Sequence, residues 1–536
     1  MPSPGESGNI NNAGRHSLSK LFPFLQNDWP LPLLLAAQVI LNLPGILIPP
    51  LWVDEAYSAI LARRTPGEIW RSMVYDAGPP LYYLLLHGWR FVFGESEAAL
   101  RGMSLLFALL TTIGVYFFGK LCFDKKTASF ASLLWICAPL CVFNAGQARN
   151  YTLLSALSVG LALGAVFYWR KPRKWTWAAS LALLTAAVYT HNAAWFMALA
   201  ILAGLWALGR GDYGYAPLCN WGTMLGGALL LYLPWTPTLL AQMRITERTI
   251  GWVEKAWSPW SIGWTMNALI PGGAMPPYID LPVFPAYLYG IAILLWTAPL
   301  VPALLGMMQP QGKMLRFLTA FFLVGLAGPY LYSLIWKPIY LVGRTDFFLT
   351  PFWCLLAGAA VSQLQRKWLG NLLIAILAAQ SLGLSLYMEL RDQERSELDI
   401  VRYLEQRGKP GDAVLCTGLT RPPMEYYLKP KGFRILSYPR DMAQHLAHLN
   451  EEWYAKNVDL DAEAQECIEE AKSVLTGQGQ LWVIGSERRI NEPLFEQLQR
   501  EKTLRGLNRV QTPKMGLRKI GEPLFILPYL QANDAG

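Results

Sequence analysis

Charged residues are scarce in this sequence of 536 residues: they make up 15% of it, against about a quarter in ordinary soluble domains. The scarcity is confined to the first 388 residues, which hold 39 of the 83 charged side chains, whereas the last 148 hold 44. The apolar portion has a net charge of +11 and the tail of −2. A basic excess in an apolar portion indicates membrane topology and contact with anionic lipids. Nucleic-acid binding would need a basic face on a soluble domain, so we expect membrane lipids and no nucleic acid as partners.

Several features that carry chemistry in other proteins are missing. The seven cysteines form no CxxC pair, and most lie in apolar runs, so they predict no metal framework. Cys416 and Cys467 lie in the tail, and they could form a disulfide if that tail is in an oxidising compartment. No Gly-rich phosphate loop and no internal repeat is present. The first 28 residues contain no short apolar stretch with a small-residue cleavage site, so we expect no removable signal peptide.

Long apolar runs are abundant instead. Measured against the roughly 20 residues that a helix needs to cross a bilayer, about eleven runs are candidate spans. They centre on residues 31–49, 98–119, 127–145, 151–168, 175–190, 193–209, 217–235, 283–305, 317–336, 346–364 and 369–388. The run at 79–94 is also apolar but contains His87 and Arg90, so it is predicted to be an interfacial or re-entrant helix.

The basic loops fall on one side of this arrangement. With an inside N-terminus, fourteen Lys and Arg residues lie on that same side, as the positive-inside rule requires. They are Arg15, Lys20, Lys120, Lys125, Lys126, Arg170, Lys171, Arg173, Lys174, Arg210, Lys313, Arg316, Arg366 and Lys367. We therefore expect a multi-pass protein of the cell (inner) membrane, with a cytoplasmic N-terminus and an extracytoplasmic tail.

Three parts follow from these patterns. Residues 1–28 are predicted to be a cytoplasmic segment, residues 29–389 a transmembrane domain with a first outer loop at about 50–97, and residues 390–536 a soluble extracytoplasmic α/β domain. Predicted helices of the tail lie at 399–407, 461–475 and 492–502, and predicted strands at 413–416, 434–437, 480–484 and 524–527. Strands that alternate with helices favour a mostly parallel sheet.

Acidic residues stand at two points of the first outer loop. Asp54 and Glu55 follow the first span directly, where Asp54 could cap a helix and Glu55 could lie in its first turn. A carboxylate at the membrane edge could also accept a proton from a hydroxyl nucleophile. Adjacent helical residues point about 100° apart, so only one of the two can face a given cleft. Asp76 is either a second cap or a second acidic site of the same loop.

Cationic and aromatic residues lie at the outer ends of later spans. Arg149 and Tyr151 stand in the segment QARNY, His191 in YTHNA, and Arg344 in VGRTD. Each can be explained singly as a residue at the end of a helix. Gathered on one membrane face with carboxylates, they indicate a polar cleft, and Arg is the side chain that best matches a phosphate.

These residues resemble a family. The order Asp-Glu after the first span, D-x-x-P-P-L-Y-Y-L-L-L-H-x-W, G-x-S-E-x-x-x-R, Q-x-R-x-Y and Y-T-H is similar to membrane glycosyltransferases of the GT-C class. It looks most like the bacterial branch of the protein O-mannosyltransferase and lipid A aminoarabinose transferase superfamily, glycosyltransferase family 39. The resemblance runs from about residue 31 to residue 389 and is looser after Tyr151, where the segments at 234–242 and 343–353 also look familiar.

The resemblance implies a GT-C fold and a role for each site residue. Asp54 resembles the catalytic carboxylate that activates the acceptor, and Glu55 its motif partner. Asp76 would be a second acidic site, associated in some members with a divalent metal or with positioning. The remaining expectations are substrate contacts by Tyr82, Tyr151 and His191 and carrier-phosphate contacts by Arg101, Arg149 and Arg344. Gly78 departs from the pattern, since many relatives carry His there and the aminoarabinose branch carries Lys, which weakens a metal or phosphate site at this position.

The expected activity is inverting transfer of a sugar from a polyprenyl-phosphate carrier to an acceptor hydroxyl or phosphate on the outer face of the membrane. No nucleotide site is needed, because such a sugar arrives on a lipid. The acceptor class stays open between glycan, lipid and protein, and the sequence names no sugar. Two alternatives stay open as well: a transporter or flippase, and a non-catalytic membrane scaffold whose tail binds a partner.

Overall fold

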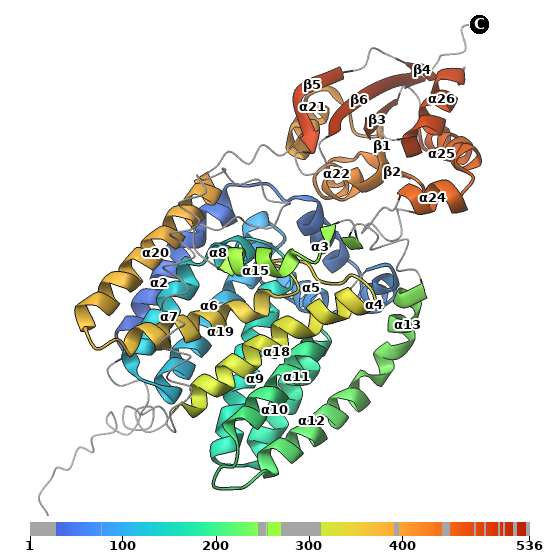
Figure 1. Ribbon diagram of the computed structural model, residues 1–536. Coiled ribbons are helices and arrows are strands. Elements are labelled where there is room, and N and C mark those ends of the chain that lie inside the picture. Colours follow the sequence, from blue (N-terminus) through green and yellow to red (C-terminus); the bar gives the residue numbers. More distant parts are fainter. Residues whose placement is uncertain are drawn as a thin grey trace, which may run out of the picture.

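A helical bundle and a smaller sheet domain make up the described part of the chain (Figure 1). The computed structural model describes residues 28–76, 78–244, 253–254, 256–269, 312–390, 396–441, 451–475, 479–486, 489–501, 504–506, 510–517 and 522–531. The predicted N-terminal segment, except for its last residue, and the predicted span at 283–305 lie outside the described residues.

Six helices of the described residues are long and apolar enough to cross a membrane. Five of them are α2 (Pro30–Leu47), α6 (Glu97–Cys122), α9 (Tyr151–Arg170), α18 (Lys313–Ile335) and α20 (Lys367–Leu390), and the sixth joins α12 (Ala216–Tyr232), η3 (Leu233–Trp235) and α13 (Thr236–Arg244). Helices α7 (Lys125–Cys137) and α8 (Pro139–Ala145) form a pair bent by 61°, which makes a seventh span if the pair crosses as one. The chain is therefore a multi-pass membrane protein.

Fewer helices reach this length than the sequence predicts. Helices α10 (Lys174–Val188) and α11 (Ala194–Leu208) have 15 residues each, and α19 (Thr350–Ser362) has 13. Fifteen helical residues extend about 23 Å, short of a hydrocarbon core of about 30 Å. The apolar runs continue through the non-helical turn at 189–193 and through η4 (Phe347–Leu349), so hydropathy alone overestimates helix length there.

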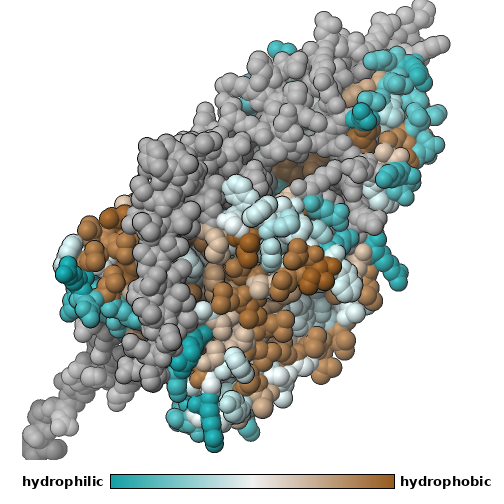
Figure 2. All heavy atoms as spheres, in the orientation of Figure 1, coloured by the Kyte–Doolittle hydropathy of each residue, from teal (hydrophilic) through white to brown (hydrophobic). Residues whose placement is uncertain are grey.

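Small residues let the helices of the bundle approach closely. A Cβ atom on Gly119 of α6 would lie 2.7 Å from the Cα atom of Ala128 in α7. A Cβ atom on Gly358 of α19 would lie 2.9 Å from the backbone N of Ala131. Close backbone approach at small residues is how membrane helices gain packing contacts in a lipid solvent. Figure 2 shows hydrophobic side chains over the visible flank of the bundle and hydrophilic ones at its lower end and on the sheet domain.

Short helices form the loop after α2. They are α3 (Val53–Arg63), α4 (Pro66–Ser72), η2 (Met73–Tyr75) and α5 (Leu81–Phe93). Helix α5 extends about 20 Å, too short to cross a bilayer. It buries Tyr82, Tyr83 and Leu86 on one side and exposes Phe91 and Phe93. The segment at 79–94 thus contains a helix too short to span, and its interfacial or re-entrant position stays a prediction.

The tail contains a six-stranded sheet in the order β2–β1–β3–β6–β4, with β5 paired to β6. The strands are β1 (Ala413–Thr417), β2 (Arg434–Tyr438), β3 (Gln480–Ser486), β4 (Leu504–Gly506), β5 (Val510–Leu517) and β6 (Glu522–Gln531). Strands β2, β1 and β3 are parallel, whereas β6 is antiparallel to β3, β4 and β5. The predicted mostly parallel sheet is thus wrong for the C-terminal half, because β4 and β5 were not predicted and β6, which contains the predicted strand at 524–527, runs antiparallel to its neighbours.

Helices cover this sheet and produce two cores. The helices are α21 (Ser396–Arg407), α22 (Arg421–Leu428), α24 (Glu451–Asn457), α25 (Leu460–Val474) and α26 (Glu492–Arg500), with short 3₁₀ turns η5 (Gly418–Thr420), η6 (Lys429–Lys431) and η7 (Arg489–Asn491). Cys416 packs in one core with α21 and α22, and Cys467 packs in the other with α25 and α26. Both are free thiols, so the disulfide that the sequence left open does not form.

Helix α22 joins the sheet domain to the loop helices. The hydroxyl of Tyr427 accepts a hydrogen bond from the backbone N of Leu51 at 2.8 Å and donates one to Glu97. The hydroxyl of Tyr426 donates to the carbonyl of Glu95 at 2.7 Å, and its ring lies under the Arg63 guanidinium. The sheet domain therefore covers the end of the bundle at which α3 begins (Figure 1).

Candidate active site

Three candidate site residues meet at this end of the bundle, although they lie far apart in the sequence. Asp54 is in the first turn of α3, Arg149 in the loop between α8 and α9, and Arg344 in the turn before η4. The Oδ2 atom of Asp54 lies 3.3 Å from Nη2 of Arg344. The Nη1 atom of Arg149 lies 3.5 Å from the backbone carbonyl oxygen of Asp54. One carboxylate and two guanidinium groups thus share one site, as the sequence predicts.

Asp54 remains accessible to solvent. Its side chain is 25% exposed and that of Arg344 is 18% exposed. The residue that caps α3 is Trp52, so Asp54 is not the helix cap that the alternative interpretation proposes. An accessible carboxylate beside two cations is suited to contact a polar ligand.

Glu55 lies in a different environment from its neighbour. Its side chain is fully buried, and its Oε1 and Oε2 atoms accept from Nε and Nη2 of Arg101, each at 2.7 Å. Oε1 also accepts from the backbone N of Ala148 at 3.0 Å, and Oε2 from that of Trp52 at 3.4 Å. Buried in this way, Glu55 is not accessible to a ligand; it links α3 to α6 and to the loop that carries Arg149.

Arg101 uses all five of its N–H donors within the protein. Two go to Glu55, and the others go to the carbonyls of Ile46 at 3.2 Å, Pro49 at 2.6 Å and Pro50 at 3.0 Å. Arginine has no further donor, and the Arg101 side chain is 0% exposed. This geometry argues against the expectation that Arg101 contacts the carrier phosphate. Arg101 instead satisfies the carbonyls at the end of α2, which have no partner within the helix.

Asp76 accepts two phenol hydroxyls. Its Oδ2 atom receives a hydrogen bond from Tyr57 at 3.1 Å and from Tyr83 at 3.0 Å. Burial, then the charge of Asp76, raises the pKa of Tyr57 well above its ordinary value, so this hydroxyl stays a donor. Tyr83 in turn accepts from Nη1 of Arg149 at 3.3 Å. Asp76 is therefore connected to Arg149 through one hydroxyl, and it belongs to the same site.

The expectation of a divalent metal at Asp76 does not fit this geometry. Two hydroxyl donors occupy the Oδ2 atom of Asp76, and Gly78 supplies no side chain. Within the described ranges, no group of three or more His, Cys, Asp or Glu residues is placed to hold a metal ion. We derive no step through a metal.

The three predicted substrate residues differ in position. Tyr82 is fully buried, and its hydroxyl pairs with Ser104 at 3.0 Å, so it faces the core rather than the cleft. Tyr151 is 6% exposed, with the Arg149 guanidinium 6.0 Å from its ring centroid. His191 lies 6.4 Å from Tyr151, centroid to centroid, and its Nδ1 accepts from the backbone N of Ala193. Tyr151 and His191 therefore adjoin Arg149, whereas Tyr82 does not join them.

His191 is neutral at ordinary pH. Burial and then the positive charge of Arg149 lower the pKa of this imidazole to about 4. With Nδ1 as an acceptor, the proton of the neutral ring is on Nε2. His191 thus presents one donor without adding charge to a site that already holds two guanidinium groups.

A structured turn holds Arg344 against Asp54. Gly343 has φ of +74°, a conformation that favours glycine. Asp346 accepts from the backbone N of Gly343 at 2.6 Å through Oδ1, and from Tyr340 at 3.1 Å through Oδ2. Oδ2 also accepts from Thr265 of α15 (Ser261–Leu269). The turn that carries Arg344 is therefore fixed by a buried carboxylate two residues further on.

Sequence reasoning missed Tyr57, Tyr83 and Asp346 as parts of the site. Tyr57 is three residues after Asp54 on one helix, a spacing that places both on the same side. Tyr83 directly follows Tyr82 in the recognised motif, and the choice between two adjacent tyrosines depends on helix rotation. Asp346 gave a usable signal, because a carboxylate next to an Arg-containing turn often accepts its backbone N–H groups.

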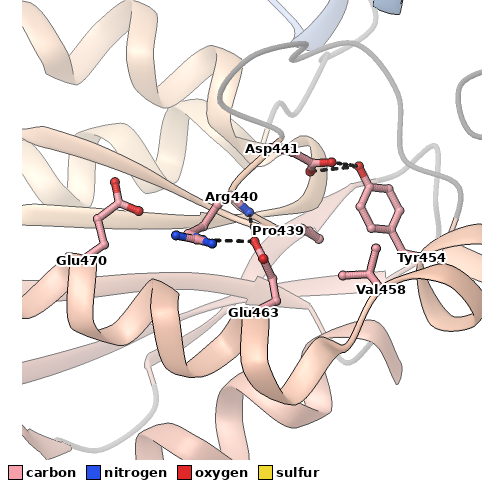
Figure 3. Close-up of a pocket in the computed structure, with 7 residues that line it drawn as sticks. All are labelled: Pro439, Arg440, Asp441, Tyr454, Val458, Glu463 and Glu470. Carbon is pink, nitrogen blue, oxygen red and sulfur yellow. Dashed lines mark hydrogen bonds and ion pairs between the residues drawn. The ribbon is translucent and has the colours of Figure 1, made fainter.

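The tail domain has a separate polar pocket of about 600 Å³ at the end of β2 (Figure 3). Arg440 pairs there with Glu463 through Nε at 3.4 Å, and also with Glu466. Tyr454 donates to both carboxylate oxygens of Asp441, at 2.9 and 3.0 Å. Acidic groups outnumber the single cation, so this pocket is poorly suited to a phosphate, and the site at Asp54 is the better candidate.

Part of the chain is similar to a known family. The family model described as dolichyl-phosphate-mannose-protein mannosyltransferase matches residues 77–240, which include Arg149 and His191. No curated protein sequence matches the chain.

Two solved structures of one protein share the fold. ArnT from Cupriavidus metallidurans in the apo state has a TM-score of 0.60 and 12% identity, covering 92% of this chain and 97% of that one. The same protein bound to undecaprenyl phosphate has a TM-score of 0.60 and 13% identity over the same shares. The oligosaccharyltransferase of Archaeoglobus fulgidus has a lower TM-score of 0.47 at 14% identity, covering 86% of this chain and 70% of that one.

The family match extends from just before α5 into α13, and the shared fold covers 92% of the chain. Residues 77–240 are therefore similar to the dolichyl-phosphate-mannose-protein mannosyltransferases, and the chain has the fold of the membrane glycosyltransferase ArnT.

Proposed function

We propose that this glycosyltransferase moves a sugar from a polyprenyl-phosphate carrier to an acceptor hydroxyl or phosphate, with inversion at C1. The observation that carries the proposal is the Asp54–Arg344 contact of 3.3 Å, with Arg149 beside it. A transfer of this kind needs a base for the acceptor and fixed positive charge for the departing phosphate. This site supplies both within one cleft.

The two arginines are proposed to bind the carrier phosphate. The Nε–H of Arg149 is buried and, among the described residues, has no hydrogen-bond partner. Buried donors without an acceptor are rare in proteins, and a phosphate oxygen would supply one. Arg344 is partly exposed and can exchange Asp54 for a phosphate as its partner.

Asp54 is proposed to be the general base. When the phosphate engages Arg344, Asp54 loses a cationic partner and becomes more basic. The acceptor oxygen then attacks C1 of the sugar, the bond from C1 to the phosphate oxygen breaks, and the acceptor proton passes to Asp54. The guanidinium groups stabilise the negative charge on the released polyprenyl phosphate. A well-placed general base contributes a factor of about 10²–10⁴ in rate.

Asp76, Tyr83 and Tyr57 are proposed to be positioning residues. Asp76 orients the Tyr83 hydroxyl, which accepts from Arg149 and so restricts where that guanidinium points. His191 and Tyr151 are proposed to contact the sugar or the phosphate on the other side of Arg149. Glu55 and Arg101 support the site from the protein interior.

The location of the reaction follows from the same arrangement. ArnT from Cupriavidus metallidurans is bound to undecaprenyl phosphate in one structure, and we propose a carrier of that kind here. The site lies opposite the basic loops, so we place it on the outer face of the cell (inner) membrane, with the N-terminus in the cytoplasm. The domain division at 29–389 and 390–536 and an extracytoplasmic position for the tail belong to the same proposal.

Asp54→Asn tests the proposal directly. Purified full-length protein would be assayed for transfer from a panel of polyprenyl-phosphate sugars, with and without candidate acceptors. We expect Asp54→Asn to reduce turnover at least about 100-fold while binding of the carrier is retained. Asp461→Asn, which removes an exposed carboxylate of α25, is the matched control and should remain active. Full turnover by Asp54→Asn would refute the assignment of the base, and no carrier binding by the wild type would refute the proposed donor.

A further inference from the structure

A basic pocket lies at the opposite end of the bundle from Asp54. It has a volume of about 350 Å³ and is lined by Trp169, Arg170, Arg210, Gly211, Asp212 and Lys313. Arg170 ends α9, whose first residue adjoins Arg149, and a helix of 20 residues extends about 30 Å. Lys313 begins α18, and Arg344 follows the end of that helix. The pocket and the catalytic site are therefore separated by the thickness of the bundle.

The fold builds this pocket around Trp169. The indole N–H of Trp169 donates to the carbonyl of Gly209 at 3.3 Å, and the Nζ atom of Lys313 lies 5.6 Å from the ring centroid. Gly211 lies so close that a Cβ atom there would be 3.1 Å from the indole. The tight loop after α11 is thus packed against α9 and presents Arg210 beside Arg170 and Lys313.

The charges of this pocket are incompletely neutralised. Arg170 donates to the backbone carbonyl of Leu121 at 2.9 Å. Within the part of the chain that the structure describes, none of the three cations forms an ion pair with a carboxylate, and Asp212 is the one acidic residue that lines the pocket. The pocket therefore has a net charge of about +2 and can accept an anion.

The surroundings of the pocket are apolar. Trp206, on α11, is 72% exposed, Trp175, on α10, is 61% exposed, and Phe167, on α9, is 43% exposed. Exposed aromatic side chains next to cations at the end of membrane helices are typical of the level of lipid headgroups. A free anion would use the cations alone, whereas a phospholipid would contact both the cations and the apolar flank.

We propose that this pocket binds the headgroup of an anionic phospholipid, with its phosphodiester on Arg210 and Lys313 and its acyl chains along α9 and α11. Basic pockets between membrane helices on the basic side of a protein bind such headgroups. The role is separate from sugar transfer and is independent of the function proposed for Asp54.

Native mass spectrometry of the full chain in detergent tests this. The probes are dioleoylphosphatidylglycerol, dioleoylphosphatidylcholine as a zwitterionic control, and inorganic phosphate as a competitor. The pocket variant is Arg210→Gln/Lys313→Gln. The matched control is Arg366→Gln/Lys367→Gln, which removes one Arg and one Lys before and at the start of α20, outside the pocket.

We expect the wild type and the control to retain phosphatidylglycerol, and the pocket variant to bind it about tenfold or more weakly. Melting temperatures of the three proteins would show that the variants are folded. Equal retention of the two lipids, or equal loss in both variants, would overturn the proposal. Displacement of phosphatidylglycerol by inorganic phosphate at about 10 mM would also overturn the proposal, because the ligand would then be a free anion and not a lipid.

Discussion

Replacing Arg101 by Gln would test whether the buried pair with Glu55 is structural or binds substrate. The substitution leaves the Glu55 carboxylate buried without its cation and removes the donors from the carbonyls of Ile46, Pro49 and Pro50. Removal of one member of a buried ion pair costs about 3–5 kcal/mol. Folded proteins are stable by only about 5–15 kcal/mol, so the loss is a large share of the total.

The assay is thermal unfolding of purified protein in detergent, followed by tryptophan fluorescence, together with carrier binding at a temperature where the variant is folded. Arg63→Gln is the matched control, because Arg63 pairs with Glu95 at 2.9 Å on a partly exposed surface. An exposed pair contributes about 0–1 kcal/mol, so the control should melt close to the wild type. We expect Arg101→Gln to melt far lower and still to bind the carrier.

The double variant Glu55→Gln/Arg101→Met sharpens the test. Without a buried charge it should be more stable than Arg101→Gln, and the two single effects should not add. Our reasoning would be refuted if Arg101→Gln had an unchanged melting temperature and did not bind the carrier. That outcome would place Arg101 on the phosphate, as the family resemblance implies.

Three further predictions use other features of the site and its support. A Cβ atom at Gly78 meets nothing within 4 Å, so Gly78→Ala should leave the melting temperature unchanged or raise it. Gly358→Ala brings a Cβ atom to 2.9 Å from the Ala131 backbone and should destabilise the fold by about 1–3 kcal/mol. The pKa of His191 is about 4 in the folded protein and about 6.5 in the unfolded chain. Between these values the unfolded chain binds more protons, so stability falls as the pH drops. The melting temperature of His191→Asn should therefore decrease less than that of the wild type between about pH 7 and pH 4.5. Tyr427→Phe removes the acceptor for the backbone N–H of Leu51, three residues before Asp54. It should lower kcat more than it changes KM for the donor. The control is Tyr403→Phe, which removes a hydroxyl that accepts from Arg407 at an exposed position and should match the wild type.

Local patterns were enough to predict most of the elements. Ten of the eleven predicted spans are helical in the described residues, since long apolar runs leave a chain in lipid no other way to satisfy its backbone groups. Strands β1, β2 and β3 were predicted within a few residues of their bounds. Helix α22 was not among the predicted helices of the tail; it has only eight residues and begins with two prolines, which are well tolerated in the first turn of a helix. Its contacts with α3 depend on tertiary packing, which no local pattern encodes.

Motif spacing placed Asp54, Arg149 and Arg344 at one end of the bundle, and the structure brings them into contact. Spacing could not separate these two arginines from Arg101. All three follow an outer segment of the chain, yet Arg101 lies four residues inside α6, where its side chain reaches the carbonyls at the end of α2. The number of acceptors that surround a guanidinium group decides whether it can bind a ligand, and that number is a property of the folded chain.

The pair Asp54 and Glu55 shows most clearly how one motif serves two purposes. Adjacent residues of a helix point about 100° apart, so the first turn of α3 directs Asp54 to Arg344 at the partly exposed site and Glu55 to the interior. Glu55, fixed by Arg101 and by the backbone N of Ala148, ties α3 to the loop that presents Arg149. The position of Arg149 relative to Asp54 is therefore set by the neighbouring carboxylate. A substitution at Glu55 would reduce activity by moving Arg149 relative to Asp54, and activity alone could not distinguish it from a substitution at Asp54. Unfolding measurements can, because disrupting the fully buried pair of Glu55 costs more stability than disrupting the partly exposed pair of Asp54.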